Sequence, residues 1–329
     1  ASFESVAEGL WSGSWSGDPE QPVGCALDWR PADLGLDLES LASVIPARTG
    51  PLAVLSIVVP MLAARDPGRF SWHREAVLPR ARVLLRRMVA ALALVRGDRT
   101  MGGGPGSDET LAVVVERSLG APTFASAIGC AFSQELTTEE DLALDQALVL
   151  TADHELNAST FAARIAASTG ADIYGCISAA LAALSGPRHG GAADRVEAIL
   201  EEAGSAERVQ EVVHERQRRG EVIEGFAHPI YAPRSDPRGD RLIEIARDLG
   251  ETRPEVRLVL ALVDAMRVGG FGGPSIDVGL VAFSRALMLP AGAATALFAI
   301  GRSAGWVAHA LEQSEAGFLV RPRARYREG

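Results

Sequence analysis

Hydrophobic positions recur along this chain mostly at the three- and four-residue spacing of a helix, and the alternating polarity typical of strands is scarce. The pattern Thr137-x-x-Glu140 predicts a capping box, in which the hydroxyl and the carboxylate each accept a hydrogen bond from a free backbone N–H group at a helix start. Leu144 and Leu148 then fall on one face. This segment is predicted to be an amphipathic helix.

A second segment carries start and stop signals for a helix. Asp236 is a favoured N-cap, Pro237 suits the first helical position, and Gly250 suits the end. Ten further segments show helical spacing: Glu39 to Val44, His73 to Val95, Asp108 to Leu119, Ser159 to Ser168, Ala171 to Leu184, Ala192 to Glu202, Ala206 to Arg219, Pro254 to Arg267, Val278 to Met288 and Ala291 to Gln313. We therefore expect an all-α fold.

The segment from Ala171 to Leu184 places small residues at helical spacing, namely Gly175, Ser178 and Ala179. Small side chains let two helix backbones approach closely, so this helix is predicted to be central or to lie at a subunit contact. The full length of 329 residues is enough for about two domains.

The charged residues narrow the possible functions. All 32 basic residues are arginines, which excludes enzymes that need a lysine Schiff base or the lysine of a nucleotide-hydrolase phosphate loop. The formal net charge of −10 argues against nucleic acid as a partner.

Cysteine usage and apolar runs point to a compartment. Cys25, Cys130 and Cys176 are odd in number and widely spaced, which is typical of reduced thiols and not of a metal site. The longest apolar run, from Pro51 to Ala64, is too short to span a bilayer and is interrupted by a proline. We expect a soluble cytoplasmic protein with no membrane contact and no metal.

Two histidines have surroundings that suit chemistry. His154 follows a helix; a zinc protease would need another histidine where Ala158 stands, so a histidine stabilised by the helix dipole is the simple alternative. His189 lies in Gly-Pro-Arg-His-Gly-Gly before a helix, whose N-terminus disfavours the imidazolium form. A neutral imidazole can donate to a developing enolate, although the same glycines could serve only the turn.

Two more segments suggest a binding site for a substrate carboxylate and a general base. His228 lies in a loop that ends at a helix start bearing Arg238, where guanidinium and free N–H groups could receive a carboxylate. Asp277 opens another helix, whose dipole favours the ionised form that a general base needs. The alternative for Asp277 is a capping role.

Together these segments resemble the citrate synthase family, in order and in spacing, over nearly the whole chain. The motifs that carry the resemblance are Ala-Asp-His-Glu-Leu-Asn-Ala-Ser-Thr-Phe from Ala152, Gly-Pro-Arg-His-Gly-Gly-Ala from Gly186, Gly-Phe-Ala-His-Pro-Ile-Tyr from Gly225, Asp-Pro-Arg from Asp236, Ser-Ile-Asp from Ser275 and Gly-Trp-Val-Ala-His-Ala-Leu-Glu-Gln from Gly305. The chain departs from the family's usual asparagine at Ala193 and Ser275.

The resemblance implies a reaction and residue roles. Citrate synthases condense an acyl-CoA, usually acetyl-CoA, with a 2-oxoacid, usually oxaloacetate. His189 would stabilise the enol, Asp277 would remove the methyl proton, and His228 would polarise the oxaloacetate carbonyl. The matched groups that would hold substrate carboxylates are His154, Arg238, Arg302 and Arg321. Coenzyme A would be a co-substrate, with Arg234 near it, and no permanently bound cofactor is implied.

The resemblance also implies an architecture. The fold would consist of a large helical domain, residues 1–188 and 289–329, and a smaller mobile one, residues 189–288. Arg321 would enter the site of the other subunit of a homodimer. Two alternatives to citrate synthesis remain open at this point. One is a 2-methylcitrate synthase that uses propionyl-CoA, and the other is a non-catalytic relative that binds a carboxylate or a CoA ester.

Overall fold

The computed structural model describes residues 1–14, 29–46, 48–95, 110–228, 230–232 and 234–325. Over these residues the chain is all-α, as predicted; an isolated antiparallel bridge between Phe226 and Pro274 is the only β pairing. The α-helices are α1 (Phe3–Ser12), α2 (Leu38–Val44), α3 (Pro51–Arg65), α4 (Arg74–Ala91), α5 (Leu111–Gly120), α6 (Phe124–Ala131), α7 (Thr138–Thr151), α8 (Ala158–Ser168), α9 (Ile173–Leu184), α10 (Gly191–Ala203), α11 (Val209–Arg218), α12 (Pro237–Gly250), α13 (Pro254–Val268), α14 (Ile276–Ala286) and α15 (Ala293–Ala316). Single 3-10 turns cover Leu92–Leu94 and Ala206–Arg208.

The predicted helix starts are confirmed in detail. Thr137 Oγ1 accepts from Glu140 N at 3.2 Å, while Thr137 N donates to Glu140 Oε2 at 2.9 Å, which is the expected capping box. Asp236 caps α12, with Pro237 as its first residue and Gly250 as its last. Cys130 and Cys176 are free thiols, and burial raises the pKa of Cys176 to about 12; Cys25 and the glycine-rich run from Met101 lie outside the described residues.

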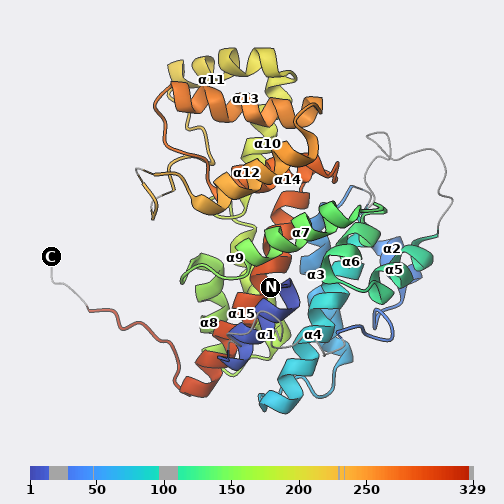
Figure 1. Cartoon of the computed structure of the whole chain (residues 1–329). Coiled ribbons are helices and arrows are strands. Elements are labelled where there is room, and N and C mark those ends of the chain that lie inside the picture. The colour runs from blue at the N-terminus through green and yellow to red at the C-terminus, as the bar shows by residue number, and fades with distance from the viewer. Residues whose placement is uncertain (15–28, 47, 96–109, 229, 233, 326–329) are drawn as a thin grey trace.

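The helices form two groups around α15 (Figure 1). Helices α10 to α14 gather at the top of the view, and α1 to α9 lie below them with α15. Every residue from Ala293 to Val307 of α15 is buried, because the helix is covered by α1, α7, α8, α9 and α14. Since this stretch is buried around its whole circumference, α15 supplies the centre of the fold.

One close approach on α15 positions the site. A side chain at Gly301 would lie 2.0 Å from Thr151 Oγ1, and one at Gly305 would lie 2.5 Å from the Ala152 carbonyl. The end of α7 can therefore cross α15 backbone to backbone only because both positions are glycine. This crossing brings the loop that carries His154 next to Arg302.

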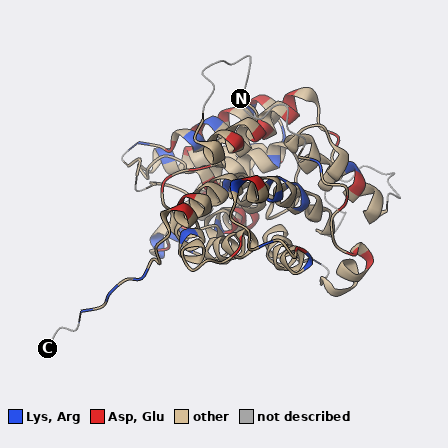
Figure 2. Cartoon of the chain, turned by 90° about the horizontal axis from the view of Figure 1, so that it is seen from below, with Lys and Arg blue, Asp and Glu red and all other residues tan. Residues whose placement is uncertain are grey.

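Basic and acidic positions are interspersed along the helices that Figure 2 shows. None of the described helices has an apolar stretch long enough to cross a bilayer.

Candidate active site

A cleft of about 640 Å³ between the two helix groups collects six of the predicted site residues. They are His154, His189, His228, Arg238, Asp277 and Arg302. These residues come from five segments that are spread over about 150 positions of the sequence. Five of the residues lie in loops or in the first turn of a helix, and Arg302 lies in the middle of α15.

His189 lies in the turn before α10 and is held by a hydroxyl. Its Nε2 is 2.8 Å from Ser159 Oγ, and that oxygen also accepts a hydrogen bond from Trp306 Nε1 at 3.2 Å. Ser159 can give its single proton either to His189 or to Asn157 Oδ1, 3.0 Å away, which already accepts from Thr160 N. When Ser159 donates to Nε2, the ring proton lies on Nδ1, and Nδ1–H becomes a donor for the cleft.

Burial, assisted by the charge of Arg302, lowers the pKa of His189 to about 4. The imidazole is therefore neutral at neutral pH, as the helix N-terminus also favours. A neutral donor of this kind can stabilise an enolate oxygen without first losing a proton.

Asp277 is the second residue of α14, and Ser275 caps this helix. The capping alternative for Asp277 is therefore wrong, because the hydroxyl of Ser275 accepts from Asp277 N at 3.1 Å and does that work. Burial raises the pKa of the Asp277 carboxyl to about 6, so most of it is ionised at neutral pH. Such a carboxylate is basic enough to accept a proton and is still available to do so.

His228 and His154 form an edge-to-face pair with ring centroids 5.9 Å apart. His228 Nδ1 accepts from Ile230 N at 3.3 Å, so the proton of the neutral ring lies on Nε2. His154 Nε2 is 2.6 Å from the hydroxyl of Tyr231. Burial lowers the pKa of both histidines, which keeps them neutral at neutral pH.

Arg302 is 1% exposed and is the least solvated charge in the cleft. Its Nε donates to the Thr151 carbonyl at 2.7 Å, its guanidinium lies 4.7 Å from the centroid of the Phe298 ring, and Nη1 has no hydrogen-bond partner. Burial lowers its pKa to about 10, so it stays cationic. In the part of the chain that is described, it has no ion pair; a buried, unpaired cation facing a cleft calls for an anionic ligand.

Arg238 differs from its predicted arrangement in one respect. Asp236, which is fully buried, accepts from Arg238 N and Nε at 3.0 Å each and from Nη2 at 2.7 Å. The same carboxylate accepts from Ile276 N at 3.2 Å. Of the N–H groups at the start of α12, the Arg238 amide is therefore not free to receive a substrate carboxylate as expected, since Asp236 already accepts from it.

Two predicted residues lie outside the cleft. Arg234 is exposed and does not line it, although its N–H donates to the carbonyl of Tyr231 at 2.8 Å. Arg321 is exposed in the irregular segment after α15, which Figure 1 shows leading away from the helices. Conversely, sequence reasoning gave no role to Ser159, Tyr231 and Trp306. All three lie within the sequence motifs quoted above. Their place in those motifs, beside the predicted catalytic residues, is the feature of the sequence that could have identified them.

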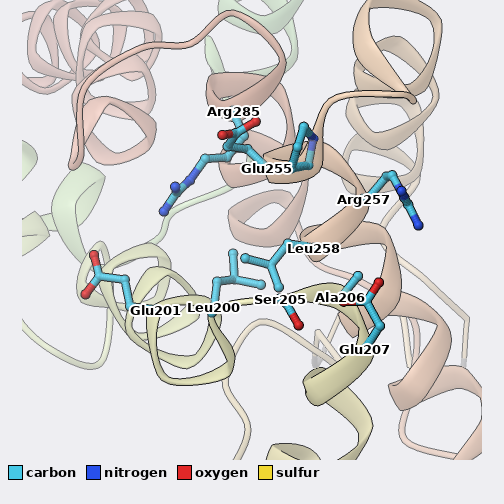
Figure 3. A pocket seen from close by; sticks show the side chains of 11 residues that line it. Leu200, Glu201, Ser205, Ala206, Glu207, Glu255, Arg257, Leu258 and Arg285 are labelled. Atoms are coloured by element: carbon cyan, nitrogen blue, oxygen red, sulfur yellow. The ribbon is translucent and has the colours of Figure 1, made fainter. Parts of the chain in front are cut away.

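A second hollow, of about 300 Å³, lies between α10, α13 and α14 (Figure 3). Its lining mixes Glu201, Glu207 and Glu255 with Arg257 and Arg285, and it contains none of the predicted residues. Across the described residues no group of three or more histidine, cysteine or acidic side chains could hold a metal ion.

The family model for the citrate synthase C-terminal domain matches residues 1–323. The chain belongs to the citrate synthase family. It is 30% identical to the citrate synthase of Haloferax volcanii, over 99% of this chain and 85% of that protein. It is 37% identical to citrate synthase 2 of Bacillus subtilis, over 56% of this chain, and that alignment spans only half the length of the relative.

Solved citrate synthases share the whole fold. The ternary complex of the Thermoplasma acidophilum enzyme with carboxymethyl coenzyme A and oxaloacetate has a TM-score of 0.79 and 28% identity, covering 100% of this chain and 86% of that one. The Thermotoga maritima citrate synthase has a TM-score of 0.73 and 27% identity, with the same coverage. This citrate synthase fold, with its large and small helical domains, is the one predicted from the sequence.

Proposed function

We propose that the protein condenses an acyl-CoA with a 2-oxoacid, most simply acetyl-CoA with oxaloacetate and water to give citrate and coenzyme A. The single observation that carries this proposal is that a carboxylate with a raised pKa, Asp277, and a neutral imidazole, His189, line one cleft together with the unpaired cation Arg302. A site for carboxylates alone would need the arginine but neither the base nor the neutral donor.

In the proposed first step, an Asp277 carboxylate oxygen takes a proton from the acetyl methyl group. The electron pair of that C–H bond forms the enol double bond, and the carbonyl oxygen receives a hydrogen bond from His189 Nδ1–H. Both interactions strengthen as charge develops, which is the condition for accelerating the step.

In the second step, the enolate carbon attacks the oxaloacetate carbonyl carbon and forms a carbon–carbon bond, while the π pair of that carbonyl moves to its oxygen, which accepts a hydrogen bond from His228 Nε2–H. This oxygen gains one proton to become a hydroxyl, and Asp277 releases the proton that it took in the first step, so the protons balance. Arg302 and Arg238, with His154, would hold the carboxylates. Water then cleaves the thioester of the citryl-CoA, which releases a carboxylate, the coenzyme A thiol and a proton.

The deciding experiment follows thiol release with oxaloacetate and either acetyl-CoA or propionyl-CoA. Release with acetyl-CoA supports the proposal. Preference for propionyl-CoA supports the second candidate, 2-methylcitrate synthesis, which is favoured by a 29% identical 2-methylcitrate synthase of Mycobacterium tuberculosis that aligns over 99% of this chain. Citrate binding without thiol release from either would overturn both in favour of a non-catalytic relative.

The acid limb of the pH profile is expected to report on Asp277. Since the pKa of this carboxyl is raised to about 6 and only the ionised form accepts a proton, kcat/KM should fall about tenfold per pH unit below pH 6. His189, with a pKa of about 4, stays neutral over most of this range and should add no second limb above about pH 5. Initial rates between pH 4.5 and 8.5 test this; a flat profile down to pH 5 would contradict it.

Coenzyme A is polyanionic, and Arg188 is the cation that we propose to meet it. Arg188 is exposed, lines the cleft beside His189, and makes no hydrogen bond or ion pair among the described residues. Arg238 and Arg302 are buried, and we assign them to the carboxylates of the 2-oxoacid. Arg234, which lies outside the cleft lining, would be a secondary contact after closure.

Replacing Arg188 with glutamine should therefore raise KM for the acyl-CoA about tenfold and leave KM for the 2-oxoacid unchanged. The matched control is Arg257→Gln, which removes an exposed arginine at the second hollow. Steady-state kinetics with each substrate varied in turn measure both constants. An equal rise in both would show that Arg188 acts on the cleft as a whole.

We also propose a homodimer whose small domain, residues 189–288, closes over the substrates. Support for the subunit contact comes from α8, where Phe161 and Ile165 are each 40% exposed, and from the neighbouring α9, whose Gly175 and Ala179 are half-exposed. Apolar and small side chains at a surface are typical of a helix–helix contact between subunits. Arg321 would then act in the partner's cleft, and sedimentation measures the oligomeric state.

A further inference from the structure

We propose that Ser275 is a positioning residue for the catalytic base, holding one oxygen of Asp277 so that the other is the one that accepts the substrate proton. The inference rests on the proposed function and adds a residue to its proton-transfer machinery. It arises from a position where the chain departs from the asparagine that is usual in the family.

The hydroxyl of Ser275 makes two contacts with the same residue. Its oxygen accepts from Asp277 N at 3.1 Å and donates to Asp277 Oδ2 at 3.0 Å. Since an ionised carboxylate can only accept, it is the hydroxyl of Ser275 that donates its single proton to Oδ2. In the described part of the chain Oδ1 of Asp277 has no hydrogen-bond partner, so it is the oxygen left for the substrate.

Ser275 is itself firmly fixed. It is 4% exposed, and its N–H donates to the Gly225 carbonyl at 2.7 Å. Its carbonyl oxygen would lie 2.4 Å from a side chain at Gly239, so the starts of α12 and α14 meet backbone to backbone. A donor held in this way stabilises the carboxylate without having to reorient when the reaction occurs.

Other charged and titratable groups face the same cleft but do not hydrogen-bond the base. From α12, Arg238 lowers and Asp236 raises the pKa of Asp277 through charge alone. The remaining groups that line the cleft are His154, Glu155, Arg188, His189, Glu224, His228 and Arg302. Ser275 is thus the only side chain in the described residues that donates to this carboxylate.

The test compares pH profiles of Ser275→Ala and the wild type. Loss of the donor should destabilise the ionised carboxylate and move the acid limb of kcat/KM upward by about one pH unit, the size expected for a hydrogen bond to a charged group. Ser275→Thr, which keeps a hydroxyl, should return the acid limb of kcat/KM to its wild-type pH. Ser284→Ala is the matched control, because Ser284 is on the same helix, equally buried, and its hydroxyl has no partner.

A capping role alone predicts a different result. Ser275→Ala would then lower the melting temperature but leave the limb at the wild-type pH, and this outcome would overturn the inference. If the alanine variant does not fold, Ser275→Gly serves in its place, because glycine is tolerated at an N-cap. The titration of Asp277, followed by its carboxyl ¹³C shift, should move in the same direction without any turnover. A wild type that releases no thiol would instead contradict the proposed function and leave this titration as the test of Ser275.

Discussion

Replacing Asp277 with alanine is expected to lower kcat by about 10²- to 10⁴-fold, the range typical of losing a general base. Proton removal beside a thioester is the difficult step, and among the described cleft residues Asp277 is the carboxylate that combines a raised pKa with a free oxygen. Oxaloacetate binding should stay within about threefold of the wild type, because the acid is held by arginines and histidines. Single-turnover rates and calorimetric titration with oxaloacetate measure the two effects separately.

The matched control for this variant is Asp264→Ala, which removes an exposed aspartate of α13 that forms an ion pair with Arg267. It should leave both quantities unchanged. If Asp277→Ala weakens oxaloacetate binding as much as it slows turnover, then Asp277 organises the start of α14 and does not act as the base.

Local chemistry explains which helices could be predicted from sequence. Helix α12 was predicted because Asp236, Pro237 and Gly250 all act within one segment. Helix α1 was not predicted, although Ser2 caps it and Gly13 ends it in a left-handed conformation. Helix α3 was read only as an apolar run, yet it continues through Pro60, which lies on the exposed side where water can replace the missing hydrogen bond.

The site was predictable to the extent that each residue carries its own signal. His189 and Asp277 stand at helix starts, and the order of the motifs placed them in one family. The partners of these residues were not predictable, because Ser159 meets His189 only through the packing of α8 against α15, and Tyr231 meets His154 across 77 positions of sequence. Asp236 likewise looked like a simple cap; its contact with Ile276, 40 positions away, exists only in the folded chain.

Arg302→Met should abolish most of the affinity for the 2-oxoacid while leaving the protein folded. Removing one partner of a desolvated, charged pair costs about 2–5 kcal/mol, so the dissociation constant for oxaloacetate is expected to rise by at least about 30-fold. In the free protein two effects oppose each other. The variant loses the hydrogen bond from Nε to the Thr151 carbonyl, but it no longer buries a cation whose Nη1 has no partner, and methionine can still pack on Phe298.

Thermal unfolding with and without oxaloacetate separates these contributions. A ligand at about a hundred times its dissociation constant stabilises a protein by about 2.7 kcal/mol, so the wild type should melt at a clearly higher temperature when oxaloacetate is present. The Arg302→Met protein should melt near the wild-type temperature without ligand, and at the same oxaloacetate concentration it should gain at most about a third of the wild-type stabilisation. Arg241→Met, which changes an exposed arginine of α12 outside the cleft, should keep the full shift. A variant at position 302 that retains the shift would mean that the buried cation serves the fold, and that Arg238 with the histidines suffices to hold the acid.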